Sequence, residues 1–267
     1  MKHFGEPTEK DITNAKFLLH CNEFQPNGIS EQKLTAEQVA SLLQTELDIY
    51  QIQCKIELSS SISAQAAFFP GRRVIRINKN GKFSSSFANA LGHHEIGVHL
   101  LTTVNAGIQP LNIFKIGFPN HTETQEGLAI LSEYLSGTLT LARLKTLALR
   151  VVGVSHMIRN QSFKETFSLF VEEYHIDPDE AFDINVRIYR GGGLTKDYVY
   201  LRGFKDVFDY HLKHKNVNHL LVGKTSLAYL HLLDELITRN IVKEPAYIAR
   251  SFKTQTTLDP ILTYIVK

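Results

Sequence analysis

The sequence has only two cysteines among its 267 residues, Cys21 and Cys54, and they form no CxxC pair. A disulfide-stapled secreted domain is therefore not expected. This usage favours reduced thiols that fill small spaces in the core of a cytoplasmic protein.

Long apolar runs and an excess of one charge are also missing. No stretch of 18 apolar residues occurs, so we expect no membrane-spanning helix. The N-terminal residues MKHFGEPTEKDITNAK are polar and lack the apolar centre of a signal peptide. The 29 basic residues nearly balance the 27 acidic ones, for a formal net charge of +2. Composition therefore indicates neither a nucleic-acid nor a membrane partner.

The sequence does contain a histidine-glutamate motif in the stretch LGHHEIGVHL, residues 91–100. His94, Glu95 and His99 follow the pattern H-E-x-x-x-H. Two imidazoles are typical zinc ligands, and a glutamate beside the first is suited to handle the proton of an attacking water. The pattern suggests a zinc hydrolase, whereas the neighbouring His93 is expected at the surface.

The spacing of these two histidines sets a condition on the local structure. In the better-known H-E-x-x-H motif the histidines are four residues apart and share one helix face. Five residues turn an ideal α-helix by roughly 500°, which leaves the rings about 140° apart. His94 and His99 therefore converge on one metal only if the helix carries an extra residue, as a π-bulge does. Gly97, inside the interval, would ease such a distortion.

A glutamate further along the chain offers a third ligand. The stretch TETQEGLAILSEYL, residues 122–135, predicts a helix with Thr122 and Gln125 as a capping box. Glu126 lies one turn into this helix. Two histidines and one glutamate leave the fourth zinc position open for water.

Two other glutamates of this helix, Glu123 and Glu133, compete for the same role. Glu133 lies two turns beyond Glu126 on the same face, where it could support the site without binding the metal. Gly127 costs helix stability, so it indicates that a bulky neighbour, such as the metal-bearing helix, presses close.

Capping and alternation patterns predict the other elements. Thr8 and Thr35 cap two N-terminal helices, and the second of these directs Leu42 inward. Strands follow at residues 54–58, 65–69 and 72–78, the last two as a hairpin around Pro70-Gly71. Helices are expected at about 85–105, 139–156, 163–174, 178–189, 195–215 and 227–237, with a cap at Thr195. Residues 106–121 read as a long functional loop, and 191–193 as a glycine loop.

Three stretches resemble the tyrosine carboxypeptidase family, whose bacterial members have been called QEGLA-motif proteins. They are HEIGVHLLTTVNAGIQPL (94–111), TETQEGLAILSEYL (122–135) and GGGLTKDYVYLRG (191–203). The resemblance implies that His94, His99 and Glu126 bind Zn²⁺ and that Glu95 is catalytic. The chain lacks the long extensions by which the animal enzymes engage microtubules, so we expect either a short member of the family or a trimmed chain. Tubulin is therefore not carried over as the substrate.

A carboxypeptidase also needs a cation for the terminal carboxylate of its substrate. Lys196, Tyr200 and Arg202 are the candidates for gripping the substrate. Arginine binds a carboxylate through two hydrogen bonds, and a tyrosine hydroxyl can donate to the oxyanion. Ordinary surface charge and a core tyrosine are the alternative interpretations.

We therefore expect an α+β, mostly helical zincin-like fold with a small sheet beside the zinc-binding helix. One catalytic domain should span residues 1–267, with the sheet and zinc helix in 1–106 and the Glu126 helix in 107–267. The cleft should lie between the sheet and the C-terminal helices. The expected reaction removes one C-terminal residue, tyrosine or another aromatic, from a peptide or protein, with Glu95 as general base.

Two rival functions stay open. One is another metallopeptidase, an endopeptidase or a dipeptidyl-peptidase type. The dipeptidyl peptidase III family also has H-E-x-x-x-H, but with glycine where this chain has Val98, and its E-E-x-x-A-[DE] motif is absent here. The other is a non-catalytic regulator with structural zinc. A cation that closes one end of the cleft would favour a carboxypeptidase, and a fully four-coordinate metal would favour the regulator.

Overall fold

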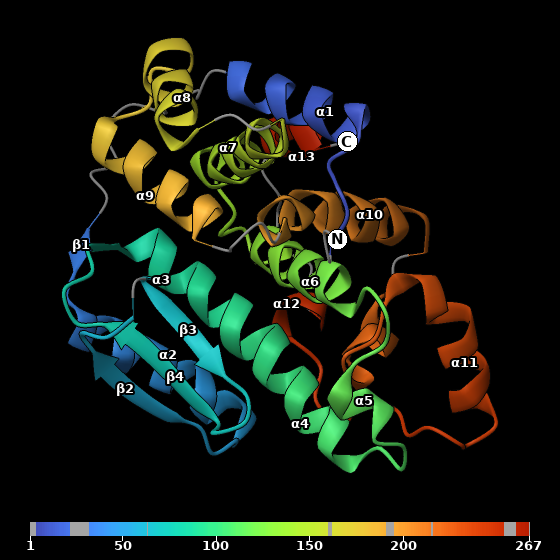
Figure 1. Ribbon diagram of the computed structural model, residues 1–267. Helices are drawn as coiled ribbons and strands as arrows, with labels where there is room; N and C mark the ends of the chain where they lie inside the picture. The colour runs from blue at the N-terminus through green and yellow to red at the C-terminus, as the bar shows by residue number, and fades with distance from the viewer. Residues whose placement is uncertain are drawn as a thin grey trace.

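The computed structural model describes residues 4–21, 32–62, 64–159, 162–190, 195–214, 216–253 and 260–266, and all structural statements concern these residues. They form a mostly helical α+β fold with two small sheets (Figure 1). The α-helices are α1 (Glu9–His20), α2 (Ala36–Tyr50), α3 (Ser85–Leu91), α4 (Leu101–Ile108), α5 (Ile113–Ile116), α6 (His121–Leu135), α7 (Leu141–Ile158), α8 (Phe163–Ser168), α9 (Pro178–Tyr189), α10 (Val199–His214), α11 (Leu230–Thr238), α12 (Arg250–Lys253) and α13 (Pro260–Val266). The strands are β1 (Lys33–Leu34), β2 (Lys55–Ser59), β3 (Ala66–Phe69), β4 (Val74–Asn78) and β5 (Phe83–Ser84).

The larger sheet has the strand order β2-β4-β3. The central strand β4 runs parallel to β2 and antiparallel to β3, and Phe69 pairs with Val74 across the turn. The predicted hairpin is confirmed, with a later start for its second strand, because Arg73 lies in the turn with φ of 49°. Among the described residues, β3 pairs with a strand on one side only. The N–H and C=O groups of its other edge can therefore form hydrogen bonds with an extended peptide.

The two N-terminal helices begin where their caps predict. Thr8 and Thr35 each accept a hydrogen bond from the backbone N–H three residues on, at 3.3 Å in both cases. Helix α2 packs against β2 and β4, behind the sheet in Figure 1. Its residues Leu43 and Leu47 are buried, but Leu42 is 41% exposed, so its predicted inward position is wrong.

One long helical rod carries the histidine motif. Ser84 caps α3 by accepting the N–H of Phe87 at 3.3 Å. The rod then continues through a π-helical segment, Gly92–Leu100, into α4, and so runs three residues beyond the predicted end at Asn105. Figure 1 shows α3 and α4 as one continuous element beside the edge strand β3. The required π distortion is therefore present, and it spans nine residues.

Helices α6 and α10 cross at a pair of glycines. A Cβ on Gly127 would lie 2.2 Å from the carbonyl oxygen of Gly203, and a Cβ on Gly203 would lie 2.0 Å from that of Glu123. The bulky neighbour predicted for Gly127 is thus the backbone of α10. The suggestion that the metal-bearing helix presses on this glycine is wrong, because the close contact comes from a segment 76 positions later (203 − 127).

The connection between α4 and α6 has its own structure, so the prediction of a long unstructured loop is wrong. It contains α5, whose Phe114 is fully buried. The Phe114 carbonyl accepts the N–H of Lys224 at 2.9 Å, and the Lys224 carbonyl accepts the N–H of Phe118 at 2.9 Å. The predicted Thr122–Gln125 capping box is also wrong. Helix α6 begins one residue earlier, after Asn120 in a left-handed conformation, which places Thr122 inside its first turn.

The remaining helices follow their predicted order, with adjustments at the ends. Helix α9 begins at Pro178 behind the cap Asp177. Thr195 precedes a 3₁₀ turn over Lys196–Tyr198, and its hydroxyl donates to the Gly5 carbonyl at 2.6 Å instead of capping a helix. The predicted glycine loop at 191–193 lies outside the described residues.

Two compositional expectations can be compared with the structure. Both Cys21 and Cys54 are free thiols, and both are partly buried. None of the helices in the described ranges combines the length and the apolarity that crossing a membrane requires. The buried apolar residues, from Ala15 in α1 to Val266 in α13, form one continuous core cluster.

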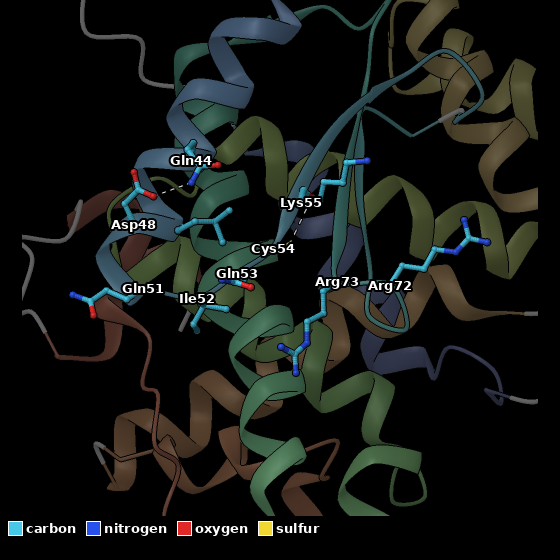
Figure 2. A pocket seen from close by; sticks show the side chains of 10 residues that line it. Gln44, Asp48, Gln51, Ile52, Gln53, Cys54, Lys55, Arg72 and Arg73 are labelled. Carbon is cyan, nitrogen blue, oxygen red and sulfur yellow. Dashed lines mark hydrogen bonds between the residues drawn. The ribbon is translucent and has the colours of Figure 1, made fainter.

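A shallow hollow lies at the C-terminal end of α2, away from the histidine motif. Its volume is about 620 Å³, and Figure 2 shows mostly polar side chains around it. Gln44 donates to Asp48 at 2.8 Å, and Arg73 lies at the opposite rim. These contacts are typical of a polar surface, and no sequence motif falls here.

Candidate metal centre

The π-helical segment brings His94 and His99 together. In a π-helix each residue bonds the fifth residue along, so positions i and i+5 share a face. The two imidazole rings accordingly have centroids 4.9 Å apart, with 72° between their planes. This local distortion is the condition that the five-residue spacing imposes, and it lets both side chains serve one ligand.

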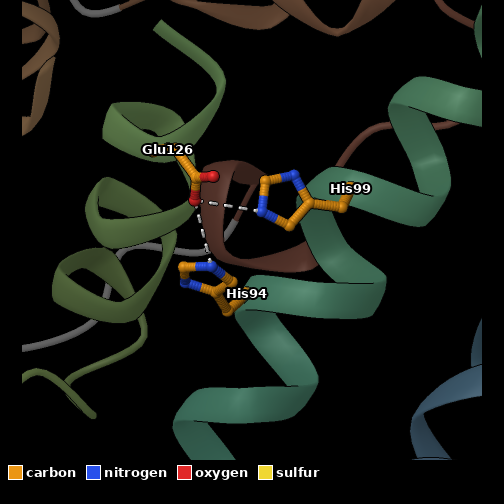
Figure 3. A group of neighbouring side chains, drawn as sticks. All are labelled: His94, His99 and Glu126. Atoms are coloured by element: carbon orange, nitrogen blue, oxygen red, sulfur yellow. Dashed lines mark ion pairs between the residues drawn. The ribbon is translucent and has the colours of Figure 1, made fainter. Parts of the chain in front are cut away.

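Glu126 of α6 completes the group (Figure 3). Its Oε2 lies 3.7 Å from His94 Nε2 and 3.5 Å from His99 Nε2. The three donor atoms all lie within 4.8 Å of one another. Two ligands held at zinc-like distances by a tetrahedral ion are about 3.3 Å apart. The donor set is of the kind that zinc uses, and the two histidine–glutamate spacings lie within a few tenths of an ångström of this value.

A buried glutamate supports the first histidine. Glu133 Oε1 lies 2.7 Å from His94 Nδ1, and Glu133 Oε2 accepts a hydrogen bond from Arg143 Nε at 3.4 Å. A ligating histidine is commonly held in this way by a carboxylate on its other nitrogen. The expectation that Glu133 supports the site is borne out by this contact, which leaves Nε2 directed towards Glu126.

Charge holds these side chains together. Burial alone would lower the pKa of His94, but the carboxylates of Glu126 and Glu133 outweigh burial and raise that pKa to about 10. Burial would raise the pKa of Glu126, yet His94 and His99 bring it well below its usual range. The group therefore presents a carboxylate and two strongly attracted imidazoles, and a metal cation can take the place of the proton on His94.

A large cleft opens at this group. Its volume is about 2340 Å³, and His94, Glu95, His99 and Glu126 all line it. The sheet side contributes β3, including Phe68, and the other side contributes residues of α6, α7 and α9. The cleft thus lies between the sheet and the later helices, where the sequence placed it.

Two of the three candidates for gripping the substrate reach the metal group. Lys196 Nζ lies 3.1 Å from Glu126 Oε1 and 5.6 Å from the centroid of the Tyr200 ring. Both Lys196 and Tyr200 line the cleft. The Tyr200 hydroxyl accepts a hydrogen bond from Arg187 Nη2 at 3.2 Å, and the phenol proton remains free to be donated into the cleft.

Arg202 lies elsewhere. Its guanidinium forms an ion pair with Asp11 of α1 and donates to the Tyr198 hydroxyl at 3.1 Å. It is not among the residues that line the cleft. The physical reason is helical geometry, because residues two apart, such as Tyr200 and Arg202, point to different sides of α10. Arg202 is therefore better described as tying α10 to α1.

His93 belongs to the same helical rod and was expected at the surface, but it is partly buried. Its Nδ1 is enclosed and has no hydrogen-bond partner among the described residues. Burial, with a contribution from Arg250, lowers its pKa to about 4, so the imidazole is neutral near pH 7. Its backbone carbonyl accepts from Ser132 of α6 at 3.1 Å, which ties the rod to α6.

Sequence reasoning missed the arginines that line the cleft, among them Arg143 and Arg150 of α7 and Arg187 of α9. The α7 stretch reads as a buried core helix without acids, and eight of its 18 residues are buried. The available signal was the seven-residue separation of Arg143 and Arg150, which places both on one face of an otherwise apolar helix.

The fold and the site define a mostly helical α+β protein with a two-histidine, one-glutamate group, of the kind that can hold a metal ion, in a large cleft. Comparison with protein families matches residues 1–267 to the microtubule-associated tyrosine carboxypeptidase family, and the chain belongs to that family. Membership supports peptidase activity and a peptide or protein substrate. A comparison with curated proteins found no match.

Proposed function

We propose that this chain is a zinc-dependent carboxypeptidase that hydrolyses the C-terminal peptide bond and releases tyrosine or another aromatic residue. The observation that carries the proposal is the convergence of His94, His99 and Glu126 in a cleft that Glu95 also lines. The family match supports the carboxypeptidase reaction and tyrosine as the residue released. We assign the activity to a single zincin-like domain over residues 1–267.

Each residue of the site has a distinct role. Zinc, when bound by His94, His99 and Glu126, supplies Lewis acidity towards water and a peptide carbonyl. Glu95 accepts the proton of the attacking water and passes it to the leaving amine. Tyr200 is positioned to donate its phenol proton to the carbonyl oxygen, because its ring packs by Lys196, which contacts Glu126.

The charge in the cleft favours a carboxypeptidase over an endopeptidase or a dipeptidyl peptidase. An endopeptidase must accommodate uncharged backbone on both sides of the bond that it cuts. Here Arg150, Arg187 and Lys196 crowd around Tyr200, with their charged groups 5.5–5.6 Å from its ring centroid. A concentration of cations beside the metal group suits a substrate that ends in a carboxylate.

The ligand count favours catalysis over a structural zinc site. Structural zinc is almost always held by four protein ligands. In the part of the chain that the structure describes, the group contains three such side chains and no fourth histidine, cysteine, aspartate or glutamate. All three side chains line the cleft, so water and substrate would reach a metal ion held by them.

The test is peptide cleavage by wild type and the Glu95→Gln variant, followed by mass spectrometry. Peptides ending in Tyr, Phe, Leu or Glu are offered with free and with amidated C-termini. Wild type should remove one residue from the free-ended Tyr and Phe peptides, and Glu95→Gln should be inactive. Internal cleavage or equal cleavage of the amides would instead support the other metallopeptidases. No cleavage by zinc-loaded protein would support the regulator.

A further inference from the structure

Arg150 is a charged side chain in the cleft that has no ion-pair partner among the described residues. It lies on α7 and lines the same cleft as His94 and Glu126. Its Nε is enclosed and has no hydrogen-bond partner among the described residues. Its guanidinium makes one contact of note, with the face of Tyr200, at 5.6 Å from the ring centroid. A buried donor without a partner costs free energy unless something completes it.

The neighbouring cations already have acidic partners. Arg187 Nε donates to Asp197 Oδ1 at 2.7 Å, and Lys196 Nζ lies 3.1 Å from Glu126 Oε1. Arg143, which lies two turns before Arg150 on the same face of α7, pairs with Glu133 at 3.4 Å. Arg150 is therefore the excess positive charge of this part of the cleft, and an anion is what would balance it.

The surroundings of Arg150 also indicate that its positive charge is not balanced by a nearby acidic side chain. Burial lowers the pKa of its guanidinium to about 9, and the nearby Arg187 and Arg143 add to the effect. The side chain is still positively charged near pH 7 at that value. The acidic residues of α9 that line the cleft, Asp179, Glu180 and Asp183, form no ion pair with it. Asp197 also attracts Arg150, but its carboxylate is already paired with Arg187, so a carboxylate of the substrate would supply the compensating charge.

A chain of contacts links this cation to the metal group. Contacts run from Arg150 to the Tyr200 ring, from that ring to Lys196, and from Lys196 to Glu126. In a carboxypeptidase substrate the terminal carboxylate lies one residue beyond the bond that breaks, and one residue spans about 3.5 Å. The residue that binds the terminal carboxylate must therefore lie near the metal group without being part of it.

We propose that Arg150 is the residue that binds the C-terminal carboxylate of the substrate, through paired hydrogen bonds from its guanidinium. Tyr200 holds the guanidinium by its ring face, and Arg187 adds positive charge beside the same ring. This inference rests on the proposed carboxypeptidase function and makes it specific, because Arg150 replaces Arg202 as the cation that selects a free C-terminus.

The test measures binding without turnover, in the Glu95→Gln background. An N-terminally labelled peptide ending in Tyr is titrated as the free acid and as the amide, and fluorescence anisotropy gives each Kd. The acid should bind at least tenfold more tightly than the amide. Adding Arg150→Gln should abolish this preference by weakening acid binding at least tenfold, and should leave amide binding unchanged. Arg150→Lys should fall between, because lysine keeps the charge but not the planar fork.

Arg159→Gln is the matched control, since Arg159 ends the same helix but is 63% exposed and lies 3.8 Å from Glu9. It should leave both Kd values unchanged. Circular dichroism and thermal unfolding identify misfolded protein, and Arg150→Lys then decides the matter. Acid preference as strong as that of the protein with Arg150, in a folded Arg150→Gln or Arg150→Lys variant, would overturn the assignment, as would equal binding of acid and amide with Arg150 present. If binding behaves as expected but wild type cleaves nothing, the proposed reaction fails while the carboxylate site stands.

Discussion

His94 Nδ1 and Glu133 Oε1 lie 2.7 Å apart across the interface between the π-helical rod and α6. The contact fixes the imidazole with Nε2 towards Glu126, and Glu133 is in turn held by Arg143. Burial would raise the pKa of Glu133, but Arg143 and His94 lower it, so the carboxylate is ionised when it supports the histidine.

Removing this support should weaken metal binding without removing a ligand. We expect Glu133→Ala to lower zinc affinity by roughly 10–100-fold, because His94 loses the partner that orients it. A competition titration with a zinc-sensitive dye measures the affinity. Glu123→Ala on the same helix is the control and should bind zinc like wild type. Equal affinities for wild type and Glu133→Ala would show that the contact has no role in metal binding.

Tyr198, just before α10, and Tyr200, in its first turn, should have different effects on activity and stability when substituted. Tyr200→Phe removes the proposed donor to the carbonyl oxygen, so kcat should fall by roughly 10²–10³-fold. Tyr198→Phe removes a hydroxyl that donates to the Phe4 carbonyl and accepts from Arg202. That change should lower the free energy of unfolding by about 1 kcal/mol and leave kcat unchanged. Steady-state kinetics and urea unfolding of both variants test this. An unchanged kcat in Tyr200→Phe would contradict the proposed role of Tyr200 as the donor to the carbonyl oxygen.

The glycine crossing of α6 and α10 should be intolerant of a methyl group. In Gly127→Ala the new Cβ would overlap the Gly203 backbone, which cannot move aside as a side chain can. We expect a loss of about 3 kcal/mol in unfolding free energy, together with lower zinc occupancy, because Glu126 is the adjacent residue. Gly107→Ala in α4 is the matched control. No atom lies within 4 Å of its added Cβ, so it should be neutral or stabilising. Equal stability of the two variants would contradict the described crossing.

Glu123 and Asp206 give the protein a pH-dependent contribution to stability. Burial, opposed by Arg202 and reinforced by Asp206, raises the pKa of Glu123 to about 7, above its ordinary value of 4.5. The folded state therefore keeps a proton that the unfolded state has lost between these pH values. This stabilisation is fully present below pH 4.5 and is lost as the pH rises through about 7.

Glu123→Gln removes that dependence, because glutamine cannot ionise. The variant should match wild type near pH 5 and become the more stable protein above pH 7.5. Urea unfolding of both proteins at a series of pH values measures the difference. A constant difference across this range would show that Glu123 has an ordinary pKa.

Local features of this chain were predictable from its sequence. Thr35 with Gln38 marked the start of α2, because a capping box is a contact between residues three apart. The five-residue spacing of His94 and His99 required a π distortion, and the structure contains one. Both predictions needed only short-range geometry.

Features that depend on distant segments were not predictable in the same way. Gly127 indicated a close neighbour, but no residue near it in the sequence identified that neighbour as α10. Arg202 follows Tyr200 by two positions, and only the packing of α10 between α6 and α1 shows which of the two faces the metal group. Arg150 looked like part of an apolar core helix, since its lack of an ion-pair partner among the described residues depends on where α9 and α10 lie.

The central claim is that His94, His99 and Glu126 hold one zinc ion with a coordination position open to the cleft. A crystal structure with anomalous data collected on both sides of the zinc absorption edge tests it most directly. We expect one strong peak about 2.0–2.2 Å from His94 Nε2, His99 Nε2 and a Glu126 oxygen, with water or substrate as the remaining ligand. A peak with a fourth protein ligand, or no peak at this group in zinc-supplemented protein, would contradict the account.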